Sequence, residues 1–186
     1  QAQYTDNWKA HHRHQHPFCS TLFTTNFDTL LQRALQLNNQ LFFVSDTPGH
    51  YSDKPEDDHE AVHIIQAHGS IFRPMLANTE DEIKKRRDDI SGSFVDYFEK
   101  RGVIVMGYGG WDDALMQALN DCDRFSGNLY WCDIHSNKDS KSKLRSNVLE
   151  LLEKHKDRAF YVSLPEGGAN IALQEIHKTL GLGNYP

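Results

Sequence analysis

Long hydrophobic runs and paired cysteines are both missing from this sequence of 186 residues. No apolar stretch approaches the roughly 20 residues that cross a bilayer, which excludes a membrane protein, and no hydrophobic leader indicates secretion. The three cysteines, Cys19, Cys122 and Cys132, are far apart and form no CxxC pair. An odd number of scattered cysteines provides no disulfide framework and is typical of a reducing cytoplasm.

Positive charge is also scarce, because 20 lysines and arginines against 26 aspartates and glutamates leave a net charge of −6. Such a chain is a poor candidate for holding nucleic acid through its overall field. What is present is 38% hydrophobic and 11% aromatic residues, enough to bury a core. We expect a single domain over residues 1–186 and, because the first residue is Gln1 and not Met, a fragment of a longer chain.

Predicted strands and helices alternate along the chain. β-branched, aromatic and continuous apolar runs predict strands at 22–25, 41–44, 62–67, 102–106, 129–134 and 160–164. Apolar residues three and four apart predict helices at 27–35, 80–101 (in two pieces broken near 91–93), 111–119, 144–152 and 171–180. This alternation indicates the α/β class, with a Rossmann-like parallel sheet and helices on both of its faces.

Residues that follow each strand are the candidates for chemistry, since ligands of parallel sheets bind beyond the carboxyl ends of the strands. The first strand is followed by Asn26 and Asp28, the third by His68, the fourth by the glycine-rich turn 107–110, and the fifth ends near Asp133. This set suits a nucleotide. Backbone N–H groups of the turn approach phosphate, a carboxylate accepts from ribose hydroxyls, and an imidazole moves a proton at neutral pH.

Each candidate also has a plain structural interpretation. Asn26 and Asp28 are both favourable caps for the helix that follows. His68 before a glycine is typical of a turn, and Asp133 is typical of a solvated loop. Asp112 opposes a phosphate at the start of the next helix, because its own charge occupies the positive end of the helix dipole, or it is the N-cap of that helix.

Three segments, taken in order, resemble the sirtuin-like family of NAD-binding proteins. They are TTNFD at 24–28, HGS at 68–70 and GYGG at 107–110. They are similar to the family's Thr-Gln-Asn-Ile/Val-Asp segment, to its catalytic His-Gly and to its Gly-Thr-Ser. The resemblance covers roughly residues 15–135 and is closer to the bacterial anti-phage defence branch than to the deacetylases.

The resemblance implies roles for single residues. Asn26 would position the attacking water or the nicotinamide ribose, and His68 would be the general base. The other contacts with NAD would fall to Thr25, Asp28, Gly107, Gly109 and Asp133. Among these, the resemblance assigns Asp28 to the nicotinamide end, the two glycines to the phosphates or the ribose beside them, and Asp133 to the adenine ribose.

Two features of the family have no counterpart in this sequence. Nothing in residues 1–20 resembles the opening strand and Gly-Ala-Gly-x-Ser loop that wraps the pyrophosphate, so we expect the first βα unit to be missing here or to lie upstream. The deacetylases' zinc ribbon of two CxxC pairs is also without a counterpart, so we expect no zinc and no other metal in the site. The histidines at 11, 12, 14 and 16 favour adventitious metal binding.

The predicted function is that of a sirtuin-type NAD⁺ glycohydrolase (NADase) in bacterial anti-phage defence, with NAD as substrate. We expect a cytoplasmic protein, a homo-oligomer or part of a larger defence complex, and no direct nucleic-acid or membrane partner. Two alternatives stay open. One is a non-catalytic sensor of NAD or ADP-ribose, and the other is an NAD-dependent protein deacylase.

Overall fold

The computed structural model describes residues 19–45, 61–67, 91–134 and 144–180. Their contacts divide the chain into two compact units, Gln1–Leu76 (unit 1) and Ala77–Pro186 (unit 2). Each unit has a three-stranded sheet of its own, and all neighbouring strands run parallel. The α/β class and the parallel, Rossmann-like arrangement are therefore confirmed, while a single domain over residues 1–186 stays a prediction.

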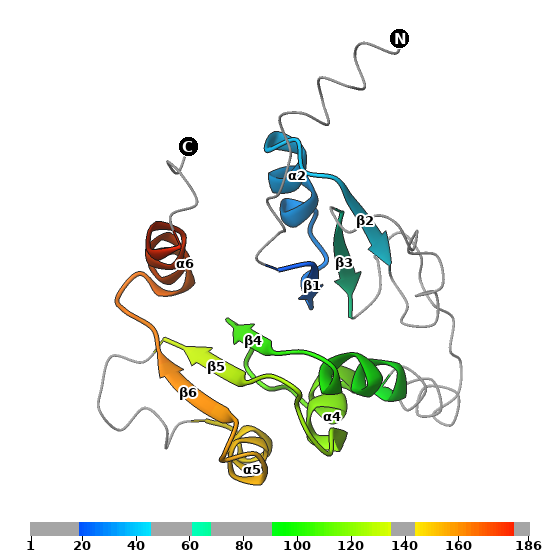
Figure 1. Cartoon of the computed structure of the whole chain (residues 1–186), viewed down its shortest axis with the longest axis vertical. Coiled ribbons are helices and arrows are strands. Elements are labelled where there is room, and N and C mark those ends of the chain that lie inside the picture. The colour runs from blue at the N-terminus through cyan, green and yellow to red at the C-terminus, as the bar shows by residue number, and fades with distance from the viewer. Residues whose placement is uncertain (1–18, 46–60, 68–90, 135–143, 181–186) are drawn as a thin grey trace. The chain divides into compact units, whose positions relative to one another are not determined.

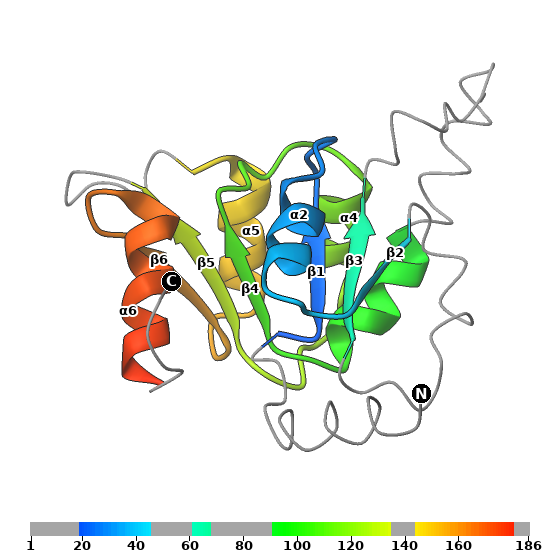
Figure 2. The same ribbon diagram turned by 90° about the horizontal axis from the view of Figure 1, so that it is seen from above.

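Unit 1 is built around a buried central strand. Its elements are β1 (Thr21–Thr24), α2 (Leu30–Leu37), β2 (Phe42–Ser45) and β3 (Val62–Gln66), with strand order β1-β3-β2. Neighbours on both sides of β3 bury all five of its residues, and Ile64 and Ile65 have no exposed surface. The helix α2 lies on one face of this sheet (Figures 1 and 2). The register places Thr24, the last residue of β1, beside Gln66 at the end of β3.

Unit 2 carries helices on both faces of its sheet. After helical residues 91–99 come β4 (Val103–Met106), α4 (Ala114–Asp121), β5 (Leu129–Asp133), α5 (Ser146–Lys154), β6 (Ala159–Ser163) and α6 (Gly168–Thr179). The strand order is β4-β5-β6. In Figures 1 and 2, α4 and α5 lie on one face and α6 lies on the other, as predicted.

The core of unit 2 lies between the central strand and the helices α4 and α5. Trp131 of β5 is 1% exposed, and the predicted apolar face of α5 is buried at Val148, Leu151 and Leu152. The opposite face of the sheet is more exposed to solvent. Ile104, Tyr130 and Phe160, which lie in register across the three strands, are 47%, 37% and 43% exposed.

Predicted elements agree with the described structure except at one predicted break and at their boundaries, where most strands differ by one residue and the helices by up to three. The helices α2 and α4 begin three residues later than predicted, at Leu30 and Ala114, because polar turn residues precede them. The break expected near 91–93 is wrong, since residues 91–99 are helical without interruption. Gly92 is tolerated within this helix. A glycine lowers helix stability relative to alanine without ending the helix, and no atom lies within 4 Å of where its Cβ would stand. Residues 80–90 lie outside the described part of the chain.

The two outer strands of each sheet pair on one side only. Within the described ranges, β1 and β2 pair with β3 alone, and β4 and β6 pair with β5 alone. The absence of a first βα unit, expected from the sequence, stays a prediction. No helix among the described residues has the length and apolar character needed to cross a membrane.

Candidate functional site

The turn after β1 is held by two short side-chain hydrogen bonds. The Oγ1 atom of Thr24 accepts from the backbone N–H of Asn26 at 3.1 Å. The Oδ1 atom of Asp28 accepts from the backbone N–H of Leu30 at 3.0 Å, which satisfies a donor of the first turn of α2. Asp28 therefore serves the first turn of α2, although the N-cap of that helix is Thr29, which makes no side-chain capping bond.

Asn26 has no comparable structural task. Its side chain is exposed, and within the described part of the chain its amide group makes no hydrogen bond. The interpretation of Asn26 as a helix cap is therefore wrong, because the first turn of α2 is served by Asp28 instead. An exposed amide at the carboxyl end of a parallel strand is available to a ligand.

His68 lies outside the described residues, so its role stays a prediction. The structure does describe the residue just before it, because the backbone N–H of Ala67 donates to the carbonyl oxygen of Thr24 at 2.9 Å. A different histidine, His63, lies inside β3 and is 2% exposed. Its Nε2 atom is 2.8 Å from Ser45 Oγ, and its ring stacks on Phe43 with 4.2 Å between centroids. His63 is therefore a structural histidine of the core.

The glycines of the turn after β4 differ in what surrounds them. Gly107 has a φ of +67° and is exposed, with no atom within 4 Å of where a Cβ would stand. A Cβ on Gly109 would stand 3.3 Å from the indole nitrogen of Trp111. Gly110 has a φ of +66° and is buried, and a Cβ there would overlap Val148 of α5. Gly107 therefore faces open space, whereas Gly110, which the sequence analysis did not single out, packs directly against Val148.

Asp113, and not Asp112, is the N-cap of α4. Its Oδ1 atom accepts from the backbone N–H of Met116 at 2.9 Å and from the hydroxyl of Tyr108 at 2.6 Å. Burial, together with the hydrogen bond to Asp113, raises the pKa of Tyr108 above its usual range. Tyr108 therefore stays a neutral donor that ties the turn to α4. A carboxylate already occupies the start of α4, which disfavours a phosphate at that point.

The start of α5 braces the same turn. The side-chain Nδ2 of Asn147 donates to the carbonyl oxygen of Gly110 at 2.9 Å. The guanidinium carbon of Arg145 lies 3.9 Å from the centre of the Trp111 ring. The sequence analysis missed both residues. The available signal was an arginine immediately before a helix, where a positive charge is unfavourable.

Asp133 lies at the same edge of unit 2 as the β4 turn, because Met106 pairs with Cys132. It is the last residue of β5 and is half-buried, and its Oδ1 atom accepts from the N–H of Ile134 at 2.7 Å. The solvated-loop interpretation of Asp133 is therefore wrong. Within unit 2, the structure brings Asp133 and the turn that contains Gly107 and Gly109 to one edge, as the sequence predicted. Thr25, Asn26 and Asp28 belong to unit 1.

Two of the three cysteines are packing residues. Cys122 is fully buried and donates from Sγ to the Ala118 carbonyl at 3.2 Å, and Cys132 is 5% exposed. Burial, followed by the nearby charge of Glu99, raises the pKa of the Cys122 thiol to about 12, and burial also raises the pKa of Cys132. Both thiols are thus poor metal ligands. Among the described residues there is no group of three or more side chains that could hold a metal ion.

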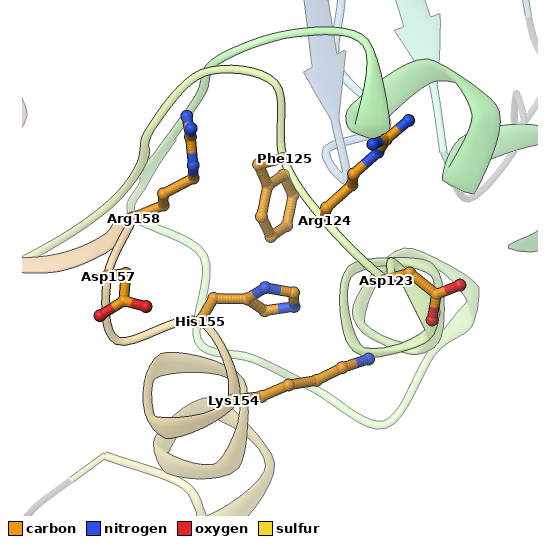
Figure 3. A pocket seen from close by; sticks show the side chains of 7 residues that line it. All are labelled: Asp123, Arg124, Phe125, Lys154, His155, Asp157 and Arg158. Atoms are coloured by element: carbon orange, nitrogen blue, oxygen red, sulfur yellow. The ribbon is translucent and has the colours of Figure 1, made fainter.

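A small hollow of about 160 Å³ lies at the opposite edge of unit 2, before β5 and β6 (Figure 3). It is lined by Asp123, Arg124, Phe125, Lys154, His155, Asp157 and Arg158. In Figure 3 the rings of Phe125 and His155 occupy its middle, with centroids 4.8 Å apart, while the guanidinium of Arg124 points away from them. Lys154 Nζ donates hydrogen bonds to the carbonyl oxygens of Asn120 and Cys122 at the end of α4. The hollow is at the amino ends of the strands, whereas the predicted nucleotide-binding residues of unit 2 lie at their carboxyl ends.

The comparison with known families agrees with this geometry. Residues 20–157 match the family described as SIR2-like domain. The matched stretch runs from just before β1 to just before β6, so it contains every predicted site residue. No curated protein matches the chain. Because the family match covers well over half of its length, the chain belongs to the SIR2-like domain family, a family of NAD-binding domains.

Proposed function

We propose that this domain is an NAD⁺ glycohydrolase of the sirtuin type. The observation that carries the proposal is Asn26, which lies in the TTNFD turn within the family match and whose exposed amide is unengaged among the described residues. Its neighbours Thr24 and Asp28 hold the turn, so Asn26 is left for a ligand.

The proposed reaction is hydrolysis of the bond between C1′ of the ribose and the nicotinamide nitrogen. The bond's electron pair moves onto the positively charged pyridinium, so nicotinamide leaves as a neutral molecule and needs no strong general acid. The ribose passes through an oxocarbenium-like transition state, and the oxygen of a water molecule forms the new bond to C1′. The water's proton passes to His68 and then to solvent, which leaves nicotinamide, ADP-ribose and one proton.

Asn26 would orient the attacking water or the nicotinamide ribose through its amide. One carboxylate oxygen of Asp28 accepts from the backbone N–H of Leu30, and the other oxygen would accept from the nicotinamide amide. The remaining contacts with the nucleotide are proposed for Thr25, Gly107, Gly109 and Asp133. Gly107 suits this role because no side-chain or backbone atom crowds it on the side where a Cβ would stand.

Measuring nicotinamide release from NAD⁺ separates this proposal from its two rivals. Release by the protein without any acylated peptide supports the hydrolase. Release only in the presence of an acyl-lysine peptide supports the deacylase, and binding of NAD⁺ or ADP-ribose without release supports the sensor. The Asn26→Ala variant is the blank for the assay, since contaminating NADase activity would persist in it.

Zinc content is a second test, directed at the deacylase alternative. Cys122 and Cys132 are buried packing residues, which argues against a zinc ribbon built on them. We expect metal analysis, after chelator removes loosely held ions, to find no stoichiometric zinc. One tightly held zinc per chain would contradict the proposal of a zinc-free branch.

We further propose that the NADase acts in bacterial anti-phage defence, in the cytoplasm and within a homo-oligomer or larger complex. The support for this is the resemblance of the TTNFD, HGS and GYGG segments to that branch. Bacteria that express the natural protein should lose NAD⁺ during phage infection, and bacteria that express its Asn26→Ala variant should retain it. Equal NAD⁺ levels in the two cultures would contradict the defence role.

A further inference from the structure

Arg145 lies at the carboxyl ends of the unit 2 strands and makes no ion pair with a carboxylate among the described residues. The guanidinium of Arg145 stacks on the ring of Trp111 at 3.9 Å, and its positive charge also acts to lower the pKa of Tyr108, against the larger effect of burial. Both side chains are exposed, and Trp111 is 58% exposed. An arginine stacked on an aromatic ring keeps the N–H groups along its edge free to donate.

This stacked pair borders the turn after β4. Trp111 follows the glycines directly, and a Cβ on Gly109 would stand 3.3 Å from its indole nitrogen. Asn147, two residues after Arg145, donates to the carbonyl oxygen of Gly110 at 2.9 Å. These contacts fix the position of Arg145 relative to the turn, whose first residue, Gly107, is open to solvent.

Arg145 does not serve the helix that it precedes. It is the N-cap of α5 and makes no side-chain capping bond. Ser, Thr, Asn and Asp are the residues that favour this position, and a positive charge is unfavourable beside the positive end of a helix. At α4 the same position has the expected residue, Asp113, with its capping bond to Met116. A residue that costs local stability is a candidate for a functional task.

The negative charge of the proposed ligand requires a positively charged residue nearby. The pyrophosphate of NAD⁺ is doubly negative, the chain has a net charge of −6, and Asp113 already occupies the start of α4. We propose that Arg145, held in place by Trp111, binds a phosphate group of the nucleotide beside the open side of the Gly107–Gly110 turn. This inference rests on the proposed function and adds to it the residue that supplies the positive charge.

Calorimetry with ADP-ribose on the wild-type protein and on Arg145→Gln tests the assignment. We expect the variant to bind at least about tenfold more weakly, which is the scale of one charge-assisted hydrogen bond. The affinity of the wild type should fall more steeply with added salt than that of the variant, because a charged contact is screened. A purely structural role would leave this salt dependence unchanged.

The chain offers a matched control in Arg101, which stacks on Tyr97 at 3.8 Å and precedes β4 at the amino edge. Arg101→Gln should leave ADP-ribose affinity unchanged, and Arg145→Lys should recover part of the loss because it restores the charge. Affinity and salt dependence of Arg145→Gln equal to wild type would overturn the inference while the proposed function stands. A wild-type protein that binds neither NAD⁺ nor ADP-ribose would overturn both.

Discussion

The turn after β1 and the turn after β4 both lead from a parallel strand into a helix, yet they are stabilised in different ways. In the first turn the side-chain hydrogen bonds of Thr24 and Asp28 each reach only two residues along the chain. In the second turn the side chain of Asn147 reaches Gly110 from 37 residues away. The side-chain hydrogen bonds described for the first turn are local, whereas the second turn has local bonds and is also held by α5.

The two turns are suited to different roles. The β1 turn leaves the amide of Asn26 exposed, which suits a group that acts on a reacting atom. The β4 turn buries Gly110 against Val148 and has the Arg145–Trp111 stack beside it, which suits a rigid surface for holding a ligand. If the comparison holds, substitutions in the first turn change activity, and substitutions in the second change stability or binding.

The largest expected effect is on catalysis. We expect Asn26→Ala and His68→Ala, made in the complete natural protein, each to lower NAD⁺ cleavage by about 100-fold or more, the usual scale for a positioning group or general base. The midpoint of thermal unfolding should change little, because the Asn26 side chain is exposed. Nicotinamide release and a melting curve measure the two quantities.

A second asparagine of unit 1 provides the control for Asn26. The side chain of Asn38 donates to the Ala34 carbonyl at the end of α2, so Asn38→Ala should affect stability slightly and cleavage not at all. If Asn26→Ala and His68→Ala both unfold the protein, the two residues are structural and the assignment is wrong.

The next effect is on packing in the β4 turn. Gly107 and Gly110 have φ angles of +67° and +66°, so alanine costs backbone strain at both, but only at Gly110 would the new Cβ overlap Val148. We expect Gly110→Ala to lower the free energy of unfolding by about 2–4 kcal/mol, and Gly107→Ala by about 1 kcal/mol. Denaturant unfolding of the two variants is the measurement, and equal losses would show that α5 does not pack on this turn.

A smaller effect comes from the two aspartates. In the described part of the chain, Asp113 accepts from both Met116 and Tyr108, whereas the one hydrogen bond of the Asp28 carboxylate is from Leu30. Replacement by alanine should therefore cost about 1–2 kcal/mol at Asp113 and about 0.5–1 kcal/mol at Asp28. Asparagine at either position keeps an acceptor and should cost less than alanine. A larger loss at Asp28 than at Asp113 would contradict the view that the second turn is the more strongly braced.

The smallest effect is on pH dependence and lies away from both turns. His155 is 9% exposed, its Nε2 atom has no hydrogen-bond partner among the described residues, and burial followed by the charge of Lys154 lowers its pKa. The folded protein therefore favours the neutral ring. The stabilisation is fully present above the ordinary histidine pKa of about 6.5 and is lost as pH falls through that value toward the lower folded one.

Replacing His155 by Gln tests this titration. Between pH 7 and pH 5 the free energy of unfolding of the variant should fall less than that of the wild type. The reason is that only the wild type has an imidazole at position 155 that takes up a proton on unfolding. Binding of ADP-ribose, measured at pH 7, should be the same in both, because the residue is at the amino edge of the sheet. An identical pH dependence in the two proteins would show that His155 is not the group responsible.

Much of the site was accessible from the sequence because its determinants are local. Asn26, Asp28, Gly107 and Asp133 each follow or end a strand, and strand ends are visible in the pattern of apolar residues. The pattern of apolar residues does not predict which polar side chain makes a structural hydrogen bond and which stays exposed. Asn26 and Asp28 were equally good caps on paper, and only the hydrogen bond from Leu30 shows that Asp28 serves the helix.

The alternation of strands and helices, the α/β class and the family can be predicted from residue order alone, because they depend on periodicity and on short segments such as TTNFD. The folded arrangement was needed to show that Gly110 is a packing glycine, that Asp113 caps α4 and that Arg145 stacks on Trp111. The physical reason is that van der Waals overlap, burial and cation–π attraction act over a few ångströms in space. Arg145 and Trp111 are far apart in sequence, and they meet because α5 packs against the same face of the sheet as α4.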